Sequence, residues 1–170
     1  MRIRATIAGL VFLAGAVPDL HASESEHALT TGVSYDQCSR SGERRAQGLG
    51  VQVGYRYGLS DDFVLRAAAG YTGFLGPGLR FDVVSADAGI AYLVDALTFV
   101  PEIRVGVGYV GPGSVRYVKP DAALIGGVAL EYRRVRAFGV GISAEYRFLI
   151  RNRDEAGGIL SILLYVSKYF

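Results

Sequence analysis

Apolar side chains recur at every second position through most of this sequence. The clearest stretch runs from Leu97 to Tyr109, where Leu, Phe, Pro, Ile, Val, Val and Tyr alternate with Thr, Val, Glu, Arg and two Gly. Successive side chains of a β-strand point to opposite faces, so this pattern gives one apolar and one mainly polar face. Eight such segments cover the chain, at residues 28–35, 49–57, 63–75, 81–94, 97–109, 123–132, 138–150 and 159–170. The sequence therefore predicts an all-β protein with eight strands.

Composition favours a barrel that spans a membrane. Hydrophobic residues make up 51% of the chain, yet no apolar run after the N-terminal stretch approaches the roughly 20 residues of a spanning helix. A closed antiparallel barrel spans a bilayer without helices because every backbone group finds a partner on the next strand. Glycine, at 23 of 170 residues, is roughly twice its usual share and suits the crowded interior of a small barrel. A soluble all-β protein is the alternative.

Aromatic residues on the apolar face distinguish these two readings. They are predicted to gather in two bands, one at each end of the strands, with aliphatic and small residues between them. Such bands form the aromatic girdles of transmembrane barrels, whereas a soluble barrel has no reason to group its aromatic residues. The first band is Tyr57, Phe63, Tyr92, Phe99, Tyr132, Phe138 and Phe170, and the second is Tyr35, Tyr71, Tyr109, Tyr146 and Phe148.

The N-terminus is typical of a secretory signal peptide. Arg2 and Arg4 precede an apolar stretch from Ala5 to Val17, and Ala22 is a suitable cleavage point. We therefore expect a signal peptide over residues 1–22 and a barrel domain over 23–170; a retained anchor helix is the alternative. Removal of residues 1–22 leaves a net charge of +1, which argues against a nucleic-acid partner.

The C-terminal strand resembles the signal by which the barrel assembly machinery recognises outer-membrane barrels. It alternates from Ile159 and ends on Phe170, although Lys168 stands where an apolar residue is usual. Together with the girdles and the repeated Glu-Tyr-Arg motif at 131–133 and 145–147, this ending resembles the small OmpA/OmpX-type barrels. The resemblance implies the outer membrane of a Gram-negative bacterium, and roles in envelope stabilisation, adhesion, serum resistance or narrow pores. We expect no globular peptidoglycan-binding domain after Phe170.

Connection lengths predict which strand ends face the outside. Long segments at 36–48, 111–121 and 151–158, with a Gly-Pro-Gly turn at 76–78, are expected at the outer surface. The turns at 58–62, 95–96 and 133–137 are expected in the periplasm. Two irregularities are also expected: a bulge or register change near Ser85, because Phe81 and Val83 have the opposite parity, and a bulge at Pro101, which cannot donate to a ladder.

Charged residues on the polar face are predicted to fill the lumen. Four basic and four acidic residues have this parity: Arg56, Arg66, Asp87, Glu102, Arg104, Glu131, Glu145 and Arg147. An eight-stranded barrel is just wide enough for side chains, and buried charges need partners, so equal numbers predict a salt-bridged plug. Arg104 and Glu145 are expected to pair across Gly127. A gate that rearranges to pass ions is the functional alternative.

Catalysis is not expected. His21 lies in the signal peptide and His27 is placed before the first strand, so no imidazole lies beside a serine or aspartate. The acidic pairs Asp61–Asp62 and Asp154–Glu155 fit solvated turns. One histidine and one cysteine give no metal site, and no cofactor motif is present.

The outer loops are the expected place of any surface function. Basic residues there could meet the phosphates of lipopolysaccharide: Arg40, Arg44, Arg45, Arg116, Lys119, Arg151 and Arg153. The alternative interpretation is a solvated loop surface of mixed charge without a specific ligand, with Cys38 as an incidental loop thiol. The sequence thus favours a non-enzymatic outer-membrane barrel that acts in envelope structure or surface interaction. A narrow pore for ions or small solutes is the alternative, and a soluble lipocalin-like carrier is a further one.

Overall fold

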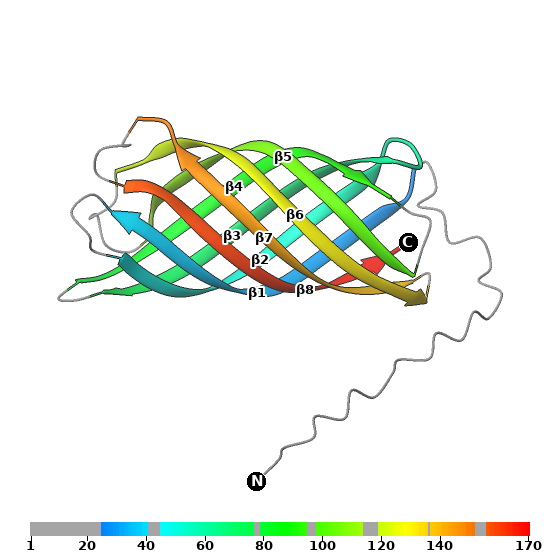
Figure 1. The fold of residues 1–170 in the computed structure, drawn as a ribbon, viewed down its shortest axis with the longest axis horizontal. Helices are drawn as coiled ribbons and strands as arrows, with labels where there is room; N and C mark the ends of the chain where they lie inside the picture. Colours follow the sequence, from blue (N-terminus) through cyan, green and yellow to red (C-terminus); the bar gives the residue numbers. More distant parts are fainter. Residues whose placement is uncertain are drawn as a thin grey trace, which may run out of the picture.

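The computed structural model describes residues 25–40, 45–76, 79–94, 98–113, 119–135, 137–151 and 156–170. They form eight antiparallel strands, each paired with its neighbours in sequence, and β1 also pairs with β8 (Figure 1). The predicted closed up-and-down barrel is confirmed. The strands are β1 (His27–Arg40), β2 (Arg45–Gly58), β3 (Phe63–Gly76), β4 (Leu79–Leu93), β5 (Phe99–Pro112), β6 (Asp121–Val135), β7 (Phe138–Leu149) and β8 (Ala156–Tyr169).

The start of the first strand and the end of the last strand lie at the same end of the barrel. The start of β1 pairs with the end of β8, where His27 and Phe170 exchange backbone hydrogen bonds of 3.2 and 3.0 Å. We call this the periplasmic end, following the predicted orientation, and the opposite end the outer end (Figure 1). Residues 1–24, which include the predicted signal peptide, lie outside the described residues. None of the described residues belongs to a helix long and apolar enough to cross a membrane.

Apolar side chains point outward and charged side chains point inward. Val105 and Val107 are 60% and 61% exposed, whereas Arg104 on the same strand is 5% exposed. Ile142 and Glu145 on β7 show the same contrast, at 47% and 2%. A soluble protein rarely exposes so large an apolar surface. The outward face therefore matches hydrocarbon, and the soluble carrier alternative is not supported by the fold.

The aromatic residues of the periplasmic girdle pair across neighbouring strands. Phe63 packs against Tyr92 with ring centroids 5.3 Å apart, and Phe99 packs against Tyr132 at 5.0 Å. At the outer end Tyr35, Tyr71, Tyr109 and Tyr146 are exposed on the outward face. Tyr57 and Phe148 also follow the predicted bands but are half-buried. These two bands mark the two limits of the apolar outward face along the barrel.

The strands extend further than the alternating pattern predicts. β1 and β2 remain paired to Ser39 and Arg45, so the connection is 41–44 and the long loop predicted at 36–48 is wrong. β5 and β6 likewise extend into the predicted 111–121 loop, and β8 begins within the predicted 151–158 loop. Beyond the outer girdle the outward face of the hairpin carries polar residues such as Gln37 and Ser39, while Cys38 between them is buried. The alternation therefore disappears although the backbone ladder continues.

Both predicted irregularities are absent. The β3–β4 and β4–β5 registers continue unbroken past Ser85, because Phe81 and Val83 point into the lumen. Pro101 keeps its register with Leu130. The Pro101 carbonyl accepts a hydrogen bond from the backbone amide of Val94 at 3.1 Å, and Val94 is one residue beyond the end of β4. The backbone N–H that proline lacks would therefore face the point where the β4–β5 ladder ends, so no ladder hydrogen bond is lost within the strands. The observed register shifts lie at Ser39/Arg40 and Tyr132/Val135.

Candidate functional site: the charged lumen

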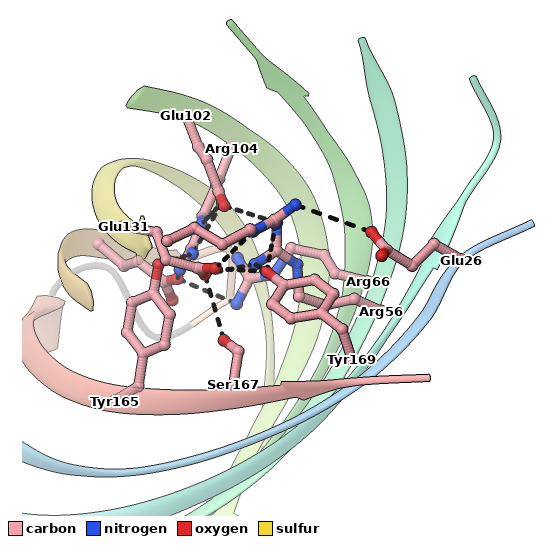
Figure 2. A network of polar contacts seen from close by, with 11 residues as sticks. Glu26, Arg56, Arg66, Glu102, Arg104, Glu131, Tyr165, Ser167 and Tyr169 are labelled. Atoms are coloured by element: carbon pink, nitrogen blue, oxygen red, sulfur yellow. Dashed lines mark hydrogen bonds and ion pairs between the residues drawn. The ribbon is translucent and has the colours of Figure 1, made fainter. Parts of the chain in front are cut away.

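The half of the lumen nearer the periplasmic end is filled by a network of ion pairs. Arg56 on β2 contacts two carboxylates, with Nη2 2.5 Å from Oε1 of Glu102 and Nη1 2.9 Å from Oε2 of Glu131. Figure 2 shows Ser167 and Tyr169 reaching from β8 toward Glu131. The Ser167 hydroxyl donates to Glu131 at 3.1 Å, and the Tyr169 hydroxyl also hydrogen-bonds Glu131. Arg133 Nε also lies 3.4 Å from Glu131 Oε1. Glu131 is fully buried, so its charge is held by protein partners alone.

Arg104 joins this cluster to a second one nearer the outer end. Its Nη2 lies 2.8 Å from Oε2 of Glu102, and its Nη1 lies 3.0 Å from Oε1 of Glu145. The contact predicted between Arg104 and Glu145 is therefore present. Gly127 lies between them, paired with Arg104 on one side and Glu145 on the other. A Cβ at Gly127 would come within 2.8 Å of Glu145 Cγ and 2.7 Å of the Ala144 carbonyl, so the close approach requires glycine.

The second cluster alternates cations and anions across the barrel. Arg66 Nη2 lies 2.9 Å from Glu145 Oε1 and 3.6 Å from Asp87 Oδ1. Arg147 Nη2 lies 3.3 Å from Asp87 Oδ2 and 3.6 Å from Glu145 Oε2. Its Nη1 also donates to the Ser161 hydroxyl at 2.7 Å. All eight charged residues predicted for the lumen thus take part in one connected set of contacts.

Several members of the network were not predicted. Arg133, placed in a turn by the sequence, belongs to β6; its guanidinium lies 3.9 Å from the centre of the Tyr169 ring and 3.7 Å from Glu26. Arg104 lies over the ring of Tyr165 at 5.3 Å and donates to its hydroxyl at 3.2 Å. The inward parity of residues 165, 167 and 169 on β8, and of 133 on β6, was the available signal.

Within this ion-pair network, charge balance is retained when the missed residues are included; the buried carboxylate of Asp36 lies outside it and accepts from the hydroxyls of Ser34 and Thr72. Arg133 and Glu26 add one charge of each sign, giving five guanidinium groups and five carboxylates in contact. A charge left without a partner in such an interior costs several kcal/mol, whereas a fully connected network is stable and rigid. The arrangement therefore closes the lumen electrostatically. The network comprises Glu26, Arg56, Arg66, Asp87, Glu102, Arg104, Glu131, Arg133, Glu145 and Arg147.

Buried apolar side chains also fill parts of the lumen near both ends. At the outer end an outer cluster surrounds the stacked rings of Phe74 and Phe81, whose centroids are 5.0 Å apart. At the periplasmic end Val64, Leu93 and Val100 form a smaller buried group. The outer cluster consists of Cys38, Phe74, Phe81, Val83, Val110, Ala123, Leu149 and Ile159. Cys38 is thus a buried strand residue, and the prediction of an incidental loop thiol is wrong.

Two of the spaces left between the described lumen side chains have the size of single water molecules. Two cavities of about 20 Å³ each lie along the wall made by β1, β2 and β3, with Gln52 lining both. A buried water needs roughly 10–15 Å³ and two to four polar partners. Gln52 Nε2 and Arg147 Nε have no hydrogen-bond partner among the described residues. These cavities therefore suit isolated waters that would satisfy such groups.

The predicted basic residues of the outer loops are only partly described. Arg44, Arg116 and Arg153 lie outside the described residues, and the side chains of Arg40 and Arg45, at the ends of β1 and β2, do as well. Lys119 and Arg151 are exposed. The backbone amide of Arg151 donates to the carboxylate of Asp121 at 3.0 Å, which anchors the start of the β7–β8 connection. The backbone thus places Arg40 and Arg45 at the tip of the extended β1–β2 hairpin.

His27 lies on the outside of the barrel, at the first position of β1 rather than before it. Its ring hydrogen-bonds the Tyr55 hydroxyl and stacks on Phe170, with centroids 6.2 Å apart and planes 6° apart. This places the imidazole in the periplasmic girdle, next to the C-terminal residue. No group of three His, Cys, Asp or Glu side chains that could hold a metal occurs in the described parts of the chain.

Comparison with known proteins relates the chain to others by its structure. No protein-family model matches the sequence, and no curated protein matches it. Ail, the attachment invasion locus protein of Yersinia pestis, is 18% identical with a TM-score of 0.60, over 86% of this chain and 99% of that one. OprG from Pseudomonas aeruginosa is 10% identical with a TM-score of 0.67, over 90% and 99%.

These neighbours differ in what they do. Ail has also been crystallised with a heparin analogue, sucrose octasulfate. The outer-membrane enzyme PagL is 17% identical with a TM-score of 0.50, over 81% of this chain and 98% of that one. At such identities the likeness shows the fold and does not transfer an activity. The protein has the fold of the small eight-stranded barrels of the bacterial outer membrane.

Proposed function

We propose that this protein is a non-enzymatic outer-membrane barrel that acts through its outer end, in envelope structure or surface interaction. The observation that carries the proposal is the closure of the lumen. Ten charged groups are paired with one another, and buried apolar groups pack in the lumen toward both ends. A barrel closed in this way offers its outer tips and its outward face to partners.

The narrow-pore alternative requires the network to open. A path through the network separates Arg66 or Arg104 from Glu145, and a path through the outer cluster displaces the Phe74–Phe81 stack. Breaking a buried pair so that one charge is left alone costs about 3–5 kcal/mol. We therefore expect the purified barrel to show no stepwise conductance in a planar lipid bilayer. Regular unitary currents at physiological salt would contradict the closed lumen and support the pore.

The proposed surface ligand is a polyanionic saccharide. Arg40, Arg44 and Arg45 fall within six positions of the sequence, where β1 ends and β2 begins, and Glu43 is the one acidic residue in that stretch. Guanidinium groups bind phosphate and sulfate in bidentate geometry. The heparin analogue bound by Ail, a barrel of the same fold, supports the same class of ligand here. Lipopolysaccharide saccharides and sulfated host glycans share this chemistry.

Charge-removing variants test the proposed ligand. The R44Q/R45Q variant should bind heparin and deacylated lipopolysaccharide more weakly, and binding by the unmodified protein should weaken with added salt. The R134Q/K168Q variant removes two exposed charges at the periplasmic end and serves as the matched control. Tighter binding of heparin would indicate a host glycan as the ligand, and tighter binding of deacylated lipopolysaccharide would indicate an envelope saccharide. Equal binding by both variants would contradict the proposal.

The absence of catalysis is also part of the proposal. His27 is engaged with Tyr55 and Phe170 in the periplasmic girdle, far along the barrel from the outer tips. PagL, an enzyme with this fold, makes a direct assay worthwhile. Purified protein incubated with lipopolysaccharide should leave its acyl chains intact by mass spectrometry. Release of fatty acid that is lost in a His27→Ala variant would contradict the non-enzymatic role.

A further inference from the structure

The buried carboxylate of Asp36 has no cationic side chain as a partner among the described residues. Asp36 on β1 is 3% exposed and takes no part in the ion pairs that balance the ten charges of the network. Its hydrogen-bond partners are two neutral groups, the hydroxyls of Ser34 at 2.7 Å and Thr72 at 2.8 Å. A buried charge is unfavourable unless a counter-charge joins it. We propose that Asp36 binds one alkali-metal cation, Na⁺ or K⁺, inside the lumen.

Three oxygen atoms from two strands converge above Gly50, which lies on the strand between them. Gly50 on β2 pairs with Ser34 on β1 and with Thr72 on β3, and Asp36 follows Ser34 at the next inward position. A Cβ built on Gly50 would lie 2.5 Å from Thr72 Oγ1, 2.6 Å from Ser34 Oγ and 2.9 Å from Asp36 Oδ2. The lack of a side chain at this position therefore leaves three oxygens facing one small space. Oxygen atoms are the ligands that hard cations prefer.

The two hydroxyls can serve the carboxylate and a cation together. Each donates its proton to Oδ2 and keeps lone pairs that can accept. The same three side chains line one of the cavities of about 20 Å³, so a single cation takes the place of the water that would fit there. Gln52 also lines this cavity; its Nε2 has no hydrogen-bond partner among the described residues, and a half-turn of the amide presents its oxygen instead. The cavity thus offers one carboxylate and three neutral oxygens.

The charges around the cavity select a monovalent cation. Glu145 and Arg147 line it too, but they lie 3.6 Å from each other, and Arg147 also lies 3.3 Å from Asp87 within the balanced network. Among the described residues of the lining, Asp36 therefore supplies the excess charge. One positive charge neutralises it, whereas a divalent cation would leave a positive charge next to Arg147. The site is independent of the proposed surface ligand.

Urea unfolding in lipid vesicles, in salts of matched ionic strength, tests the site. The D36N variant removes the charge, and the D61N variant makes the same change at the exposed β2–β3 turn as the matched control. Sodium or potassium chloride should stabilise the unmodified protein and D61N more than choline chloride does. At a cation concentration ten times its Kd, the folding equilibrium constant should rise roughly tenfold and then continue in proportion. The D36N variant should not respond, and in choline chloride it should be at least as stable as the unmodified protein, because its amide carries no charge.

Two further measurements keep the proposal testable if D36N does not fold. The G50A variant fills the space between the oxygens without removing a charge and should lose the response to Na⁺ and K⁺, whereas G126A, whose Cβ meets nothing within 4 Å, should keep it. Crystals of the unmodified protein grown with Rb⁺ should show an anomalous peak beside Asp36, Ser34 and Thr72.

Three results would overturn the site. The first is equal stability of the unmodified protein in sodium, potassium and choline chloride, which would leave a proton as the group that neutralises Asp36. The second is a gain in sodium or potassium chloride that D36N shares, or the absence of the Rb⁺ peak. The third is a gain with Mg²⁺ at lower concentrations than Na⁺ that D36N abolishes, which would contradict the monovalent charge.

Discussion

Gly127 on β6 leaves the space that the Glu145 side chain of β7 occupies in the lumen. Its neighbour Gly126 points outward, where an added Cβ would meet nothing within 4 Å, whereas a Cβ at Gly127 would press on Glu145 and the Ala144 carbonyl. The two residues are adjacent and chemically identical but lie on opposite faces of the wall. They therefore separate the effect of crowding the network from the effect of replacing glycine in a strand.

The G127A substitution should destabilise the barrel by about 1–3 kcal/mol, because it overpacks a site whose neighbours are backbone and a paired carboxylate. The G126A substitution should be neutral or stabilise by up to about 1 kcal/mol, since alanine suits a strand better than glycine. Urea unfolding of both variants in lipid vesicles measures the difference. Equal free energies of unfolding of the two variants would show that the Glu145 side chain does not require the absence of a side chain at Gly127.

Residue parity predicted the charged lumen but not all of its members. Arg104 and Glu145 were placed correctly because both lie mid-strand, where apolar-out and polar-in alternation holds. Arg133 was missed because it follows Tyr132 of the girdle and looked like the first residue of a turn. Tyr165 and Tyr169 had inward parity, yet a tyrosine on either face of a barrel strand is consistent with that pattern. Their roles depend on which guanidinium group lies opposite, and the sequence of one strand does not contain that information.

At the scale of the strand, alternation identifies the membrane-spanning part and little beyond it. The polar end of β1 continues to pair after the apolar pattern stops, so residues 36–40 and 45–48 of the predicted loop are strand. Phe81 and Val83 break the pattern for the opposite reason, since the outer end of the lumen is apolar rather than charged. The parity change at Ser85 thus marks a change in lumen content, not a bulge.

The outer cluster makes a prediction about Cys38, the single cysteine of the sequence. Phe74 is 1% exposed and stacks on Phe81 within the same cluster as Cys38. The F74S/F81S variant should therefore admit water and accelerate maleimide labelling of Cys38 roughly tenfold, the factor for about 1.4 kcal/mol of local opening free energy.

The F63S/F99S variant is the control for that measurement. It also replaces two phenylalanines by serine, but in the outward girdle at the periplasmic end. Labelling of Cys38 in this folded control should keep the slow rate of the unmodified protein. If the thiol already reacts fast in the unmodified barrel, the outer cluster does not close the lumen.

At the scale of the whole molecule, one division of side chains explains the fold and supports the proposed role. Apolar residues turned outward match the hydrocarbon core of a bilayer, and the paired charges turned inward avoid both lipid and bulk water. The charged plug depends on this division. The outer tips and the outward face are then the surfaces through which such a barrel meets its surroundings.

Methyl NMR of the barrel in lipid nanodiscs tests this division most directly. Methyl groups of Val105, Val107 and Ile142 should show NOE cross-peaks to lipid acyl-chain protons, because these side chains are 47–61% exposed on the outward face. Val100 and Val110, which are 0% and 1% exposed, should show none. Lipid contacts to Val100 and Val110 together with none to Val105 and Val107 would mean that the lumen-facing and lipid-facing side chains are interchanged. That result would contradict the account.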